Sequence, residues 1–285
     1  NLGMINSFLR FKTQNVDRKT LKLEDIQQAN KVLFSLFTRY GDTIIDLVVI
    51  QEFIAKYPNK EYLILCPRQM QPYVGELLPN VENITVNKRN IFDMIKIDRK
   101  LKKWQPDIGL NPWSNGLDSC YFLTYCKNFL CYKDFARPNT INHYQVVRRY
   151  FQLPEKAWII HELNLKQECQ KILICPQSTD ENRSISTQHL NQIITDLNQS
   201  YNGLNITIAA IDSSYFRSDC NHFFFRKTKQ SSQAFISLVK SSELVICADS
   251  APLHFALALN KHVKVVFSIT SPEIVLNSGV SILYA

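Results

Sequence analysis

Residues 243–272, ELVICADSAPLHFALALNKHVKVVFSITSP, contain the clearest secondary-structure pattern in the chain. Apolar runs at residues 244–247 and 262–267 predict two buried strands. Residues 252–259 predict a helix, and Pro252 suits its first turn. A strand, a helix and a strand in succession predict a βαβ unit with parallel strands.

The same alternation extends along most of the chain. In the first half it predicts strands at residues 32–38, 61–66, 83–86, 107–110 and 130–132, and helices at 42–56, 68–78, 91–104 and around 117–126. In the second half it predicts further strands at residues 171–175 and 205–211, and helices at 187–198 and 231–240. Residues 136–165 interrupt this rhythm with two prolines and a short helix at 143–151, so we expect them to connect two domains.

A chain of 285 residues is long enough for two compact domains, each with its own core. Alternating strands and helices predict an α/β fold with parallel sheets covered on both faces. Two such units in tandem predict a cleft between them, with ligands bound beyond the carboxyl ends of the strands.

The composition, 45% hydrophobic and 20% charged, is typical of a globular protein. The longest apolar runs reach about half the roughly 20 residues of a membrane span, and no secretory signal is evident at the start. We therefore expect a cytoplasmic protein. None of the eight cysteines forms a CxxC pair, and several lie in apolar runs, which favours free, buried thiols over a zinc site or disulfides.

The positive charge is confined to one half of the chain. Residues 1–150 hold 22 Lys and Arg against 14 Asp and Glu, whereas residues 151–285 hold 11 of each. A basic half beside a neutral half suggests that the first half meets an anionic partner. Nucleic acid, an acidic lipid surface and a phosphorylated glycolipid all fit, and a merely solubilising surface remains an alternative.

Three polar turns follow predicted strands, where α/β folds place functional groups. The first, residues 39–43, contains Gly41 and Asp42. Asp42 fits two roles, an N-cap of the next helix or a general base at the edge of a cleft. The turn lacks a GxGxxG pattern, so a dinucleotide cofactor is not indicated.

The second turn, residues 248–254, has Asp249 or Ser250 as a predicted N-cap. Its helix N-terminus offers backbone N–H groups suited to a diphosphate. His254 lies about one turn into the helix, where it either points toward the same place or packs as an ordinary histidine. The third turn, residues 176–184, offers hydroxyls, amides and the cation of Arg183, all able to hold phosphate oxygens. An ordinary loop is the alternative there.

Together these stretches resemble glycosyltransferase family 9, the ADP-heptose:lipopolysaccharide heptosyltransferases. Residues 39–45 resemble the family's N-terminal GD turn, and residues 143–154 (HYQVVRRYFQLP) its interdomain helix. Residues 244–272 resemble its segment D-T/S-G-x-x-H-x-A-A-A-x-x-x-P-x-V-x-L-F-G-x-T-x-P. The resemblance extends from about residue 31 to residue 272.

The resemblance implies a GT-B architecture, with two Rossmann-like domains, parallel sheets and an interdomain cleft. Residues 1–150, including a basic lead-in at 1–31, would bind the acceptor, and residues 151–285 the nucleotide sugar. It also implies an inverting, metal-independent reaction without a cofactor, in which Asp42 is the general base. The donor-binding residues that it implies are Ser178, Asn182, Arg183, Asp249, Ser250, Ala251 and His254.

The expected activity is therefore transfer of heptose from ADP-heptose to a bacterial lipopolysaccharide or lipooligosaccharide core. Such an anionic glycolipid would place the protein at the inner face of the cytoplasmic membrane. The sequence departs from the family at Asn182, where a Lys is usual, and at Ala251 and Ser268, where Gly is usual. We expect Arg183 to supply the cation in place of that Lys.

Other functions stay open. A family member could use another nucleotide sugar or a protein acceptor, or could be an inactive binding or scaffold homologue. The three departures favour the inactive homologue slightly, and the retained Asp42, Asp249 and His254 argue against it. Nucleic-acid binding is a weaker alternative, because the basic residues are dispersed and no nucleic-acid-binding motif accompanies them.

Overall fold

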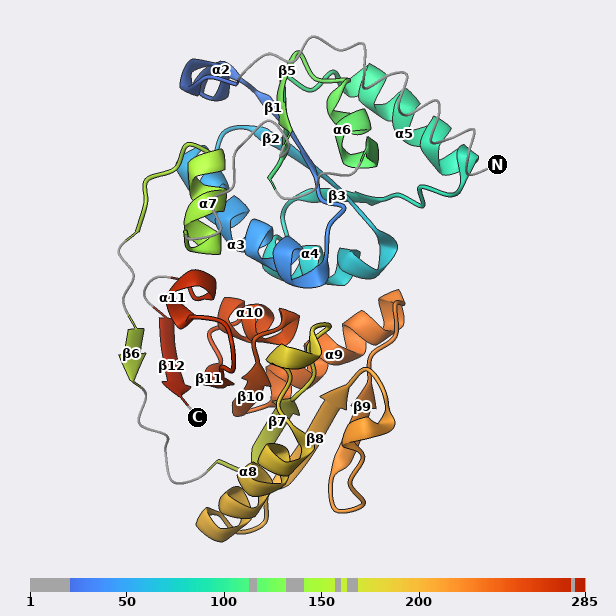
Figure 1. Cartoon of the computed structure of the whole chain (residues 1–285). Coiled ribbons are helices and arrows are strands. Elements are labelled where there is room, and N and C mark those ends of the chain that lie inside the picture. Colours follow the sequence, from blue (N-terminus) through green and yellow to red (C-terminus); the bar gives the residue numbers. More distant parts are fainter. Residues whose placement is uncertain are drawn as a thin grey trace. The chain divides into compact units, whose positions relative to one another are not determined.

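The structure, a computed structural model, describes residues 21–112, 117–131, 141–156, 160–162, 169–277 and 280–284. The chain divides into two compact units (Figure 1). The first comprises Asn1–Asn139 and Val146–Glu155, and the second comprises Thr140–Gln145 and Lys156–Ala285. Each unit is built on one parallel sheet, so the predicted α/β class is confirmed.

The first unit alternates strands with helices through its described part. Its strands are β1 (Lys31–Ser35), β2 (Glu61–Cys66), β3 (Glu82–Thr85), β4 (Ile108–Asn111) and β5 (Asn128–Cys131). Its helices are α2 (Leu23–Gln28), α3 (Tyr40–Lys56), the 3-10 turn η1 (Arg68–Met70) with α4 (Gln71–Leu77), α5 (Ile91–Trp104) and α6 (Leu117–Leu123). Helix α7 (His143–Tyr150) begins in the second unit and ends in the first.

The second unit repeats the alternation. Its strands are β6 (Ile160–Glu162), β7 (Lys171–Cys175), β8 (Asn205–Ala210), β9 (Asn221–Phe224), β10 (Leu244–Ala248), β11 (His262–Val266) and β12 (Val280–Tyr284). Its helices are α8 (Thr187–Ser200), α9 (Lys229–Ser241), α10 (Ala251–Ala258) and α11 (Pro272–Val275), with the 3-10 turns η3 (Glu181–Arg183) and η4 (Ser213–Tyr215).

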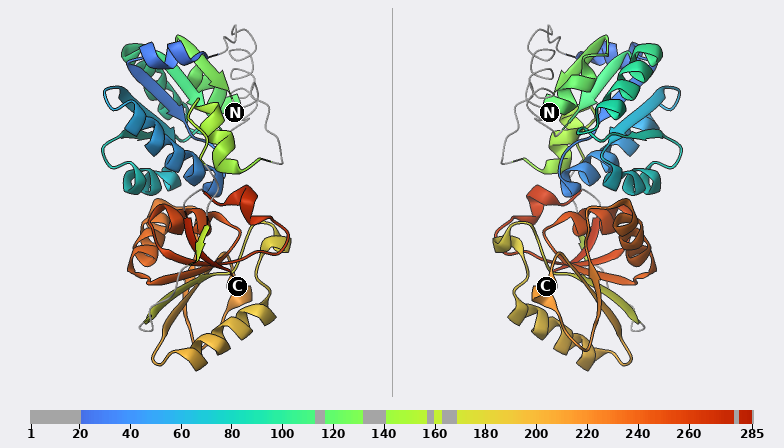
Figure 2. Two further views of the ribbon diagram at one scale, coloured as in Figure 1. Left: turned by 90° about the vertical axis from the view of Figure 1, so that its left-hand side faces the viewer. Right: turned by 90° about the vertical axis from the view of Figure 1, so that its right-hand side faces the viewer.

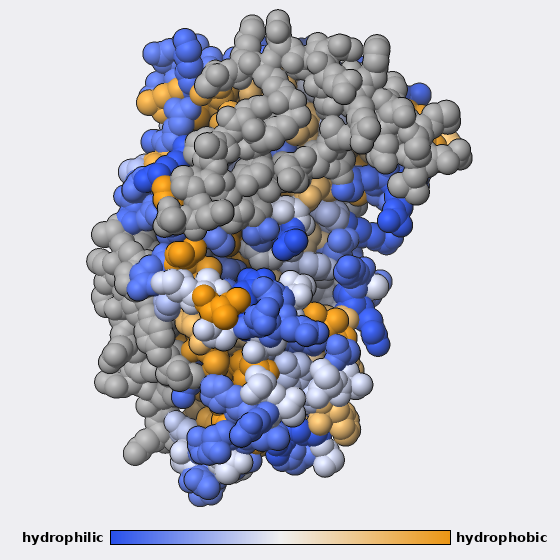
Figure 3. All heavy atoms as spheres, in the orientation of Figure 1, coloured by the Kyte–Doolittle hydropathy of each residue, from blue (hydrophilic) through white to orange (hydrophobic). Residues whose placement is uncertain are grey.

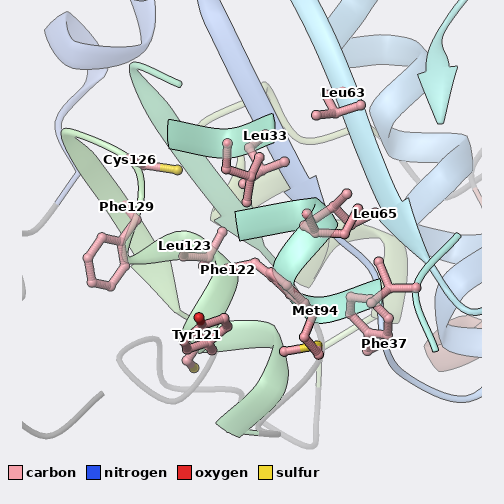
Figure 4. Packing of buried hydrophobic residues seen from close by; sticks show 14 residues of the cluster. Leu33, Phe37, Leu63, Leu65, Met94, Tyr121, Phe122, Leu123, Cys126 and Phe129 are labelled. Carbon is pink, nitrogen blue, oxygen red and sulfur yellow. The ribbon is translucent and has the colours of Figure 1, made fainter. Parts of the chain in front are cut away.

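Helices cover both faces of each sheet (Figure 2). In the first unit the strand order is β3-β2-β1-β4-β5. Leu33 on β1 and Leu65 on β2 share a core with Met94 of α5 and Phe122 of α6, whose side chains gather on one face of the sheet (Figure 4). Because successive strand residues point to opposite faces, Phe34 packs on the other side.

The second face of this sheet is covered by a cluster of aromatic side chains, with an ion pair beside it. The Phe34 ring lies 5.9 Å from Phe53 of α3 and 5.8 Å from Phe151, just after α7. Arg148 of α7 is fully buried and donates to both carboxylate oxygens of Glu52, each at 2.9 Å. The end of α7 is therefore fastened to α3 by packing and by a bidentate hydrogen-bonded pair.

The second sheet has the order β6-β12-β11-β10-β7-β8-β9. On one face, α8 buries Leu190, Ile193 and Ile194 against alternate residues of the central strands. On the other face the Phe235 ring of α9 packs against Phe255 of α10 at 6.3 Å. Such two-sided burial explains why the central strands β7 and β10 are almost wholly apolar.

The predicted rhythm of strands and helices is largely confirmed, with ends displaced by a few residues. The structure adds elements that the sequence did not predict: α2, β6, β9, α11 and β12. Residues 1–20 of the basic lead-in lie outside the described residues. Six cysteines are free and buried as expected, namely Cys66, Cys120, Cys126, Cys169, Cys175 and Cys247, while Cys220 is half-buried.

On the face shown in Figure 3, the second unit carries small hydrophobic areas separated by hydrophilic residues. Among the described helices, none has the length and apolarity needed to cross a bilayer.

Candidate active site

The first predicted turn follows β1, where the order of the first sheet reverses. Strands β2 and β3 lie on one side of β1, and β4 and β5 on the other. Such a switch point is where open α/β sheets bind ligands, beyond the carboxyl ends of their strands. The loop from β1 enters α3 at this point, so the fold places the turn around Asp42 at a favourable position.

Asp42 lies half-buried in the first turn of α3. Arg39 is the N-cap of this helix, so the alternative prediction that Asp42 caps it is wrong. A carboxylate in the first turn is favoured by the positive end of the helix dipole. Asp46 follows one turn later and is fully buried, although the sequence analysis did not single it out. Asp46 could have been singled out from the sequence, because it is the one charged residue in the apolar run at residues 43–50.

The second sheet reverses its order between β7 and β10. These strands are direct neighbours, and Cys175 near the end of β7 pairs in register with Cys247 of β10. The loops that leave their carboxyl ends therefore start side by side. They are the third and second predicted turns, which hold seven of the eight predicted site residues.

Arg183 and Asp249 connect the two loops. Nη1 of Arg183 lies 3.4 Å from Oδ2 of Asp249, although 66 residues separate them. Nε of Arg183 lies 3.6 Å from Oδ2 of Asp180. The Asp249 side chain is buried, whereas that of Arg183 is 28% exposed. The guanidinium is thus held by two carboxylates and remains accessible to an anion.

The loop after β7 is shaped by its own hydroxyls. Ser178 is buried, and its backbone N–H donates to Oγ of Ser184 at 2.9 Å. Asn182 is exposed, and its N–H donates to Oδ1 of Asp180 at 3.1 Å. The hydroxyl of Ser268, just after β11, donates to the carbonyl of Asn182. Ser268 therefore holds this loop, a role that the sequence analysis did not predict.

Helix α10 begins beside this loop. Ser250 is its N-cap, but the Ser250 hydroxyl donates to the carbonyl of Ala248 at 3.3 Å and makes no capping bond. Pro252 lies in the first turn, as predicted. Within the described part of the chain, no acceptor lies within hydrogen-bond reach of the N–H groups of Ser250 and Ala251. These N–H groups can serve an anionic ligand.

His254 is buried one turn into α10. Its Nδ1 lies 2.9 Å from the hydroxyl of Tyr144 in the first turn of α7. Burial lowers the pKa of His254 to about 4, with Arg183 acting in the same direction and Asp249 opposing it. The imidazole is therefore neutral near pH 7. No described residue bonds to its Nε2.

The structure thus joins Arg183, Asp249 and His254 into one electrostatic cluster, with the loop of Ser178 and Asn182 and the start of α10 beside it. Asp42 belongs to the other unit. Tyr144 was missed as a contributor, although the sequence analysis marked its helix as part of the resemblance. Among the described residues, no group of three or more His, Cys, Asp and Glu is arranged to hold a metal ion.

Comparison with known proteins gives matches in structure only. No family model matches the sequence, and no curated protein matches it. Structure comparison finds E. coli ADP-heptose lps heptosyltransferase II with a TM-score of 0.64 and 14% identity, covering 89% of this chain and 92% of that chain. E. coli heptosyltransferase WaaC with ADP has a TM-score of 0.61 and 12% identity, covering 89% and 93%.

A third similar structure is the family 9 glycosyltransferase from Veillonella parvula, with a TM-score of 0.63 and 12% identity, covering 90% of this chain and 86% of that one. At these identities the likeness concerns the fold. The resemblance predicted from the motifs is confirmed at that level: the chain has the α/β fold of the heptosyltransferases and of this family 9 glycosyltransferase.

Proposed function

We propose that this protein is an inverting glycosyltransferase that transfers a sugar from a nucleotide-sugar donor to a hydroxyl group. The observation that carries the proposal is the cluster of Arg183, Asp249 and His254 at the switch point of the second sheet. It lies in a chain with the fold of heptosyltransferases, one of which is known with ADP. ADP-heptose is the donor that we propose.

The second unit would hold the donor. The N–H groups of Ser250 and Ala251 and the guanidinium of Arg183 offer hydrogen bonds to the diphosphate. Neutral His254 can add a hydrogen bond from Nε2 when Nδ1 accepts from Tyr144. Ser178 and Asn182 would shape the loop around the phosphates. Net charge in this half of the chain is zero, so backbone donors would carry much of the binding.

The reaction would be a single displacement. Asp42 takes the proton from the acceptor hydroxyl while its oxygen bonds to the anomeric carbon. The bond from that carbon to the diphosphate oxygen breaks, and the nucleoside diphosphate leaves with the electron pair. Arg183 and the N–H groups of α10 stabilise the charge that develops on the leaving group, so the proposed reaction uses no metal ion.

The acceptor would be an anionic glycolipid, such as a lipopolysaccharide or lipooligosaccharide core. The excess of eight positive charges in residues 1–150 supports this choice, because Lys and Arg attract carboxylates and phosphates. An acceptor of this kind would bring the protein to the cytoplasmic face of a bacterial inner membrane.

Calorimetric titration with ADP and ADP-heptose tests the proposal, on the wild type and on Asp249→Ala and Asp42→Asn. We expect the wild type and the Asp42 variant to bind ADP and the Asp249 variant to lose binding. Asp42→Asn should also abolish sugar transfer. A well-folded wild type that binds neither ligand would refute the proposed donor.

A second candidate is an inactive homologue that binds the nucleotide without turning it over. Two features favour it: Ala251 adds a side chain at the donor turn, and the Ser268 hydroxyl bonds to the neighbouring loop. ADP binding without turnover of ADP-heptose on any offered glycolipid would support this candidate.

A further inference from the structure

Helix α5 of the first unit has two contrasting faces. Met94, Ile97 and Leu101, spaced i, i+3 and i+7, are buried in the core shared with α6. The opposite side leaves Phe92 77% exposed, with Ile91 at 51% and Ile95 at 42%. Three of the seven exposed large hydrophobic side chains in the described part of the chain therefore lie within five positions of one helix.

Cations continue the same outward side. Phe92, Lys96, Arg99 and Lys103 follow one another at intervals of four, three and four residues, which places them in one row along a helix. All four side chains are exposed. The row is about 16 Å long at the rise of an α-helix. It begins with apolar residues and continues with positive charge.

The acidic residues of α5 do not neutralise this row. Asp93 accepts from the N–H of Asn87 at 3.2 Å, and Asp98 pairs with Lys102 at 2.8 Å. Among the described residues, no carboxylate pairs with Lys96, Arg99 or Lys103. Cations in a last helical turn stabilise the helix dipole, but Lys96 and Arg99 lie near the middle, where that effect is small.

We propose that α5 docks the protein on an anionic phospholipid surface, lying in the plane of the membrane. Ile91, Phe92 and Ile95 enter the boundary of the acyl chains, and Lys96, Arg99 and Lys103 contact the lipid phosphates. An apolar patch beside a row of cations has the pattern of an interfacial helix, which gains from apolar burial and from attraction to anionic lipids.

Charge and apolar surface together favour a membrane over a nucleic acid. Phosphates of either partner would satisfy the three cations. Aliphatic side chains such as Ile91 and Ile95 find no comparable burial against a sugar–phosphate backbone, whereas a bilayer offers it. The proposal does not depend on the proposed function, because the protein can bind lipid through α5 whether or not it binds ADP. The two kinds of binding are measured in separate experiments.

The test is flotation of the full chain with vesicles. One set contains phosphatidylglycerol and phosphatidylcholine in equal amounts, and the other contains phosphatidylcholine alone. We expect the wild type to float with the anionic set and to stay unbound with the neutral set. Binding should weaken as salt is raised, because the attraction to the lipid phosphates is screened.

Variants separate the two parts of the surface. Phe92→Ala should weaken binding to anionic vesicles about tenfold, since one buried aromatic side chain is lost. The triple variant Lys96→Gln, Arg99→Gln and Lys103→Gln should weaken it on the order of a hundredfold.

Matched controls lie in the second unit: Phe216→Ala removes another exposed aromatic, and a triple change to Gln at Lys171, Arg226 and Lys227 removes three exposed cations. Both controls should bind like the wild type, and circular dichroism verifies that each variant is folded. The proposal would be overturned if the wild-type protein did not float with anionic vesicles. The proposal would also be overturned if the α5 variants bound vesicles as the wild type does, or if the controls lost binding equally. Binding to duplex DNA is measured in parallel. A charge variant that loses DNA binding while its vesicle binding is unchanged would contradict the proposal too.

Discussion

Two arginine–carboxylate pairs, one in each unit, are built in opposite ways. In the first unit Arg148 is fully buried and makes two bonds of 2.9 Å to Glu52, whose carboxylate is partly exposed. In the second unit the carboxylate of Asp249 is buried and the guanidinium of Arg183 is partly exposed, with one contact of 3.4 Å. The first pair is bidentate and its guanidinium is shielded from solvent, so we call it the closed pair; the second has one long contact and a guanidinium that solvent reaches, so we call it the open pair.

The difference separates a structural pair from a candidate binding pair. A bidentate pair with a buried guanidinium holds two helices together. Losing its carboxylate partner leaves a buried charge without compensation. A single contact of 3.4 Å holds the buried carboxylate of Asp249 less firmly than two bonds of 2.9 Å would, so its loss should cost less stability. Its value lies in the guanidinium that it orients, so we expect the two pairs to respond differently to the same kind of substitution.

The largest effect is expected at the closed pair. Glu52→Gln should lower the free energy of unfolding by about 4 kcal/mol, because it leaves the buried Arg148 without its carboxylate. Urea denaturation followed by circular dichroism measures this. Glu155→Gln, which breaks the exposed pair with Arg149, is the control and should cost less than about 1 kcal/mol. Equal losses in the two variants would contradict the distinction.

The next effect concerns the buried imidazole beside the open pair. The folded state lowers the pKa of His254 from 6.5 to about 4, so the unfolded state takes up a proton first as the pH falls. Stability should be fully present above pH 6.5 and decline by about 3 kcal/mol as the pH approaches 4. His254→Gln should flatten that part of the pH dependence. Urea unfolding curves of the wild type and of His254→Gln at several pH values measure this difference. The same pH dependence in both proteins would contradict the prediction.

At the open pair we expect binding to change more than stability. Arg183→Gln should weaken ADP binding about thirtyfold, as for the loss of a hydrogen bond to a charged group. Its urea midpoint should fall as well, because the buried Asp249 loses its cation, but by less than that of the Glu52 variant. Arg217→Gln, which removes the partner of Asp219 elsewhere in the same unit, should leave ADP affinity unchanged. Calorimetry on both variants would reveal whether Arg183 touches the nucleotide.

The smallest effect is expected at Tyr144. Tyr144→Phe should cost about 1 kcal/mol of stability, since it removes one hydrogen bond to His254. It should also shift the imidazole NMR signals of His254, because Tyr144 helps to fix the tautomer. Tyr215→Phe removes a similar bond, to the carbonyl of Ile185, and should leave those signals in place. Unchanged signals in the Tyr144 variant would mean that Tyr144 does not position His254.

Local sequence patterns predicted most of the fold. Helix α5 and strands β2 and β7 begin and end where the periodicity placed them, because apolar spacing and caps are local signals. Strand β9 was missed because its run of phenylalanines shows no alternation. Strand β6 has three residues, which are too few to show a pattern. Helix α2 has only six residues and lies inside a polar lead-in, so it was also missed.

The candidate site was predictable only as far as chain order allows. The order of strands and turns indicated which loops face the same edge, so Arg183 and Asp249 were both expected at the donor side. The partner of His254 was not predictable, since Tyr144 lies 110 residues away and nothing local marks their contact. The same holds for Ser268 and Asn182, which are 86 residues apart.

Helix α7 also determines how the protein can be divided into fragments. A cut after residue 139 would separate Glu52 from Arg148, and the backbone of Asn111 from the hydroxyl of Tyr150. A cut after residue 155 would instead remove Tyr144 from His254. No single break in this region gives each half its full set of contacts. Complementary expression of two halves would need overlapping pieces that both contain His143–Tyr150, since this segment serves two folding units at once.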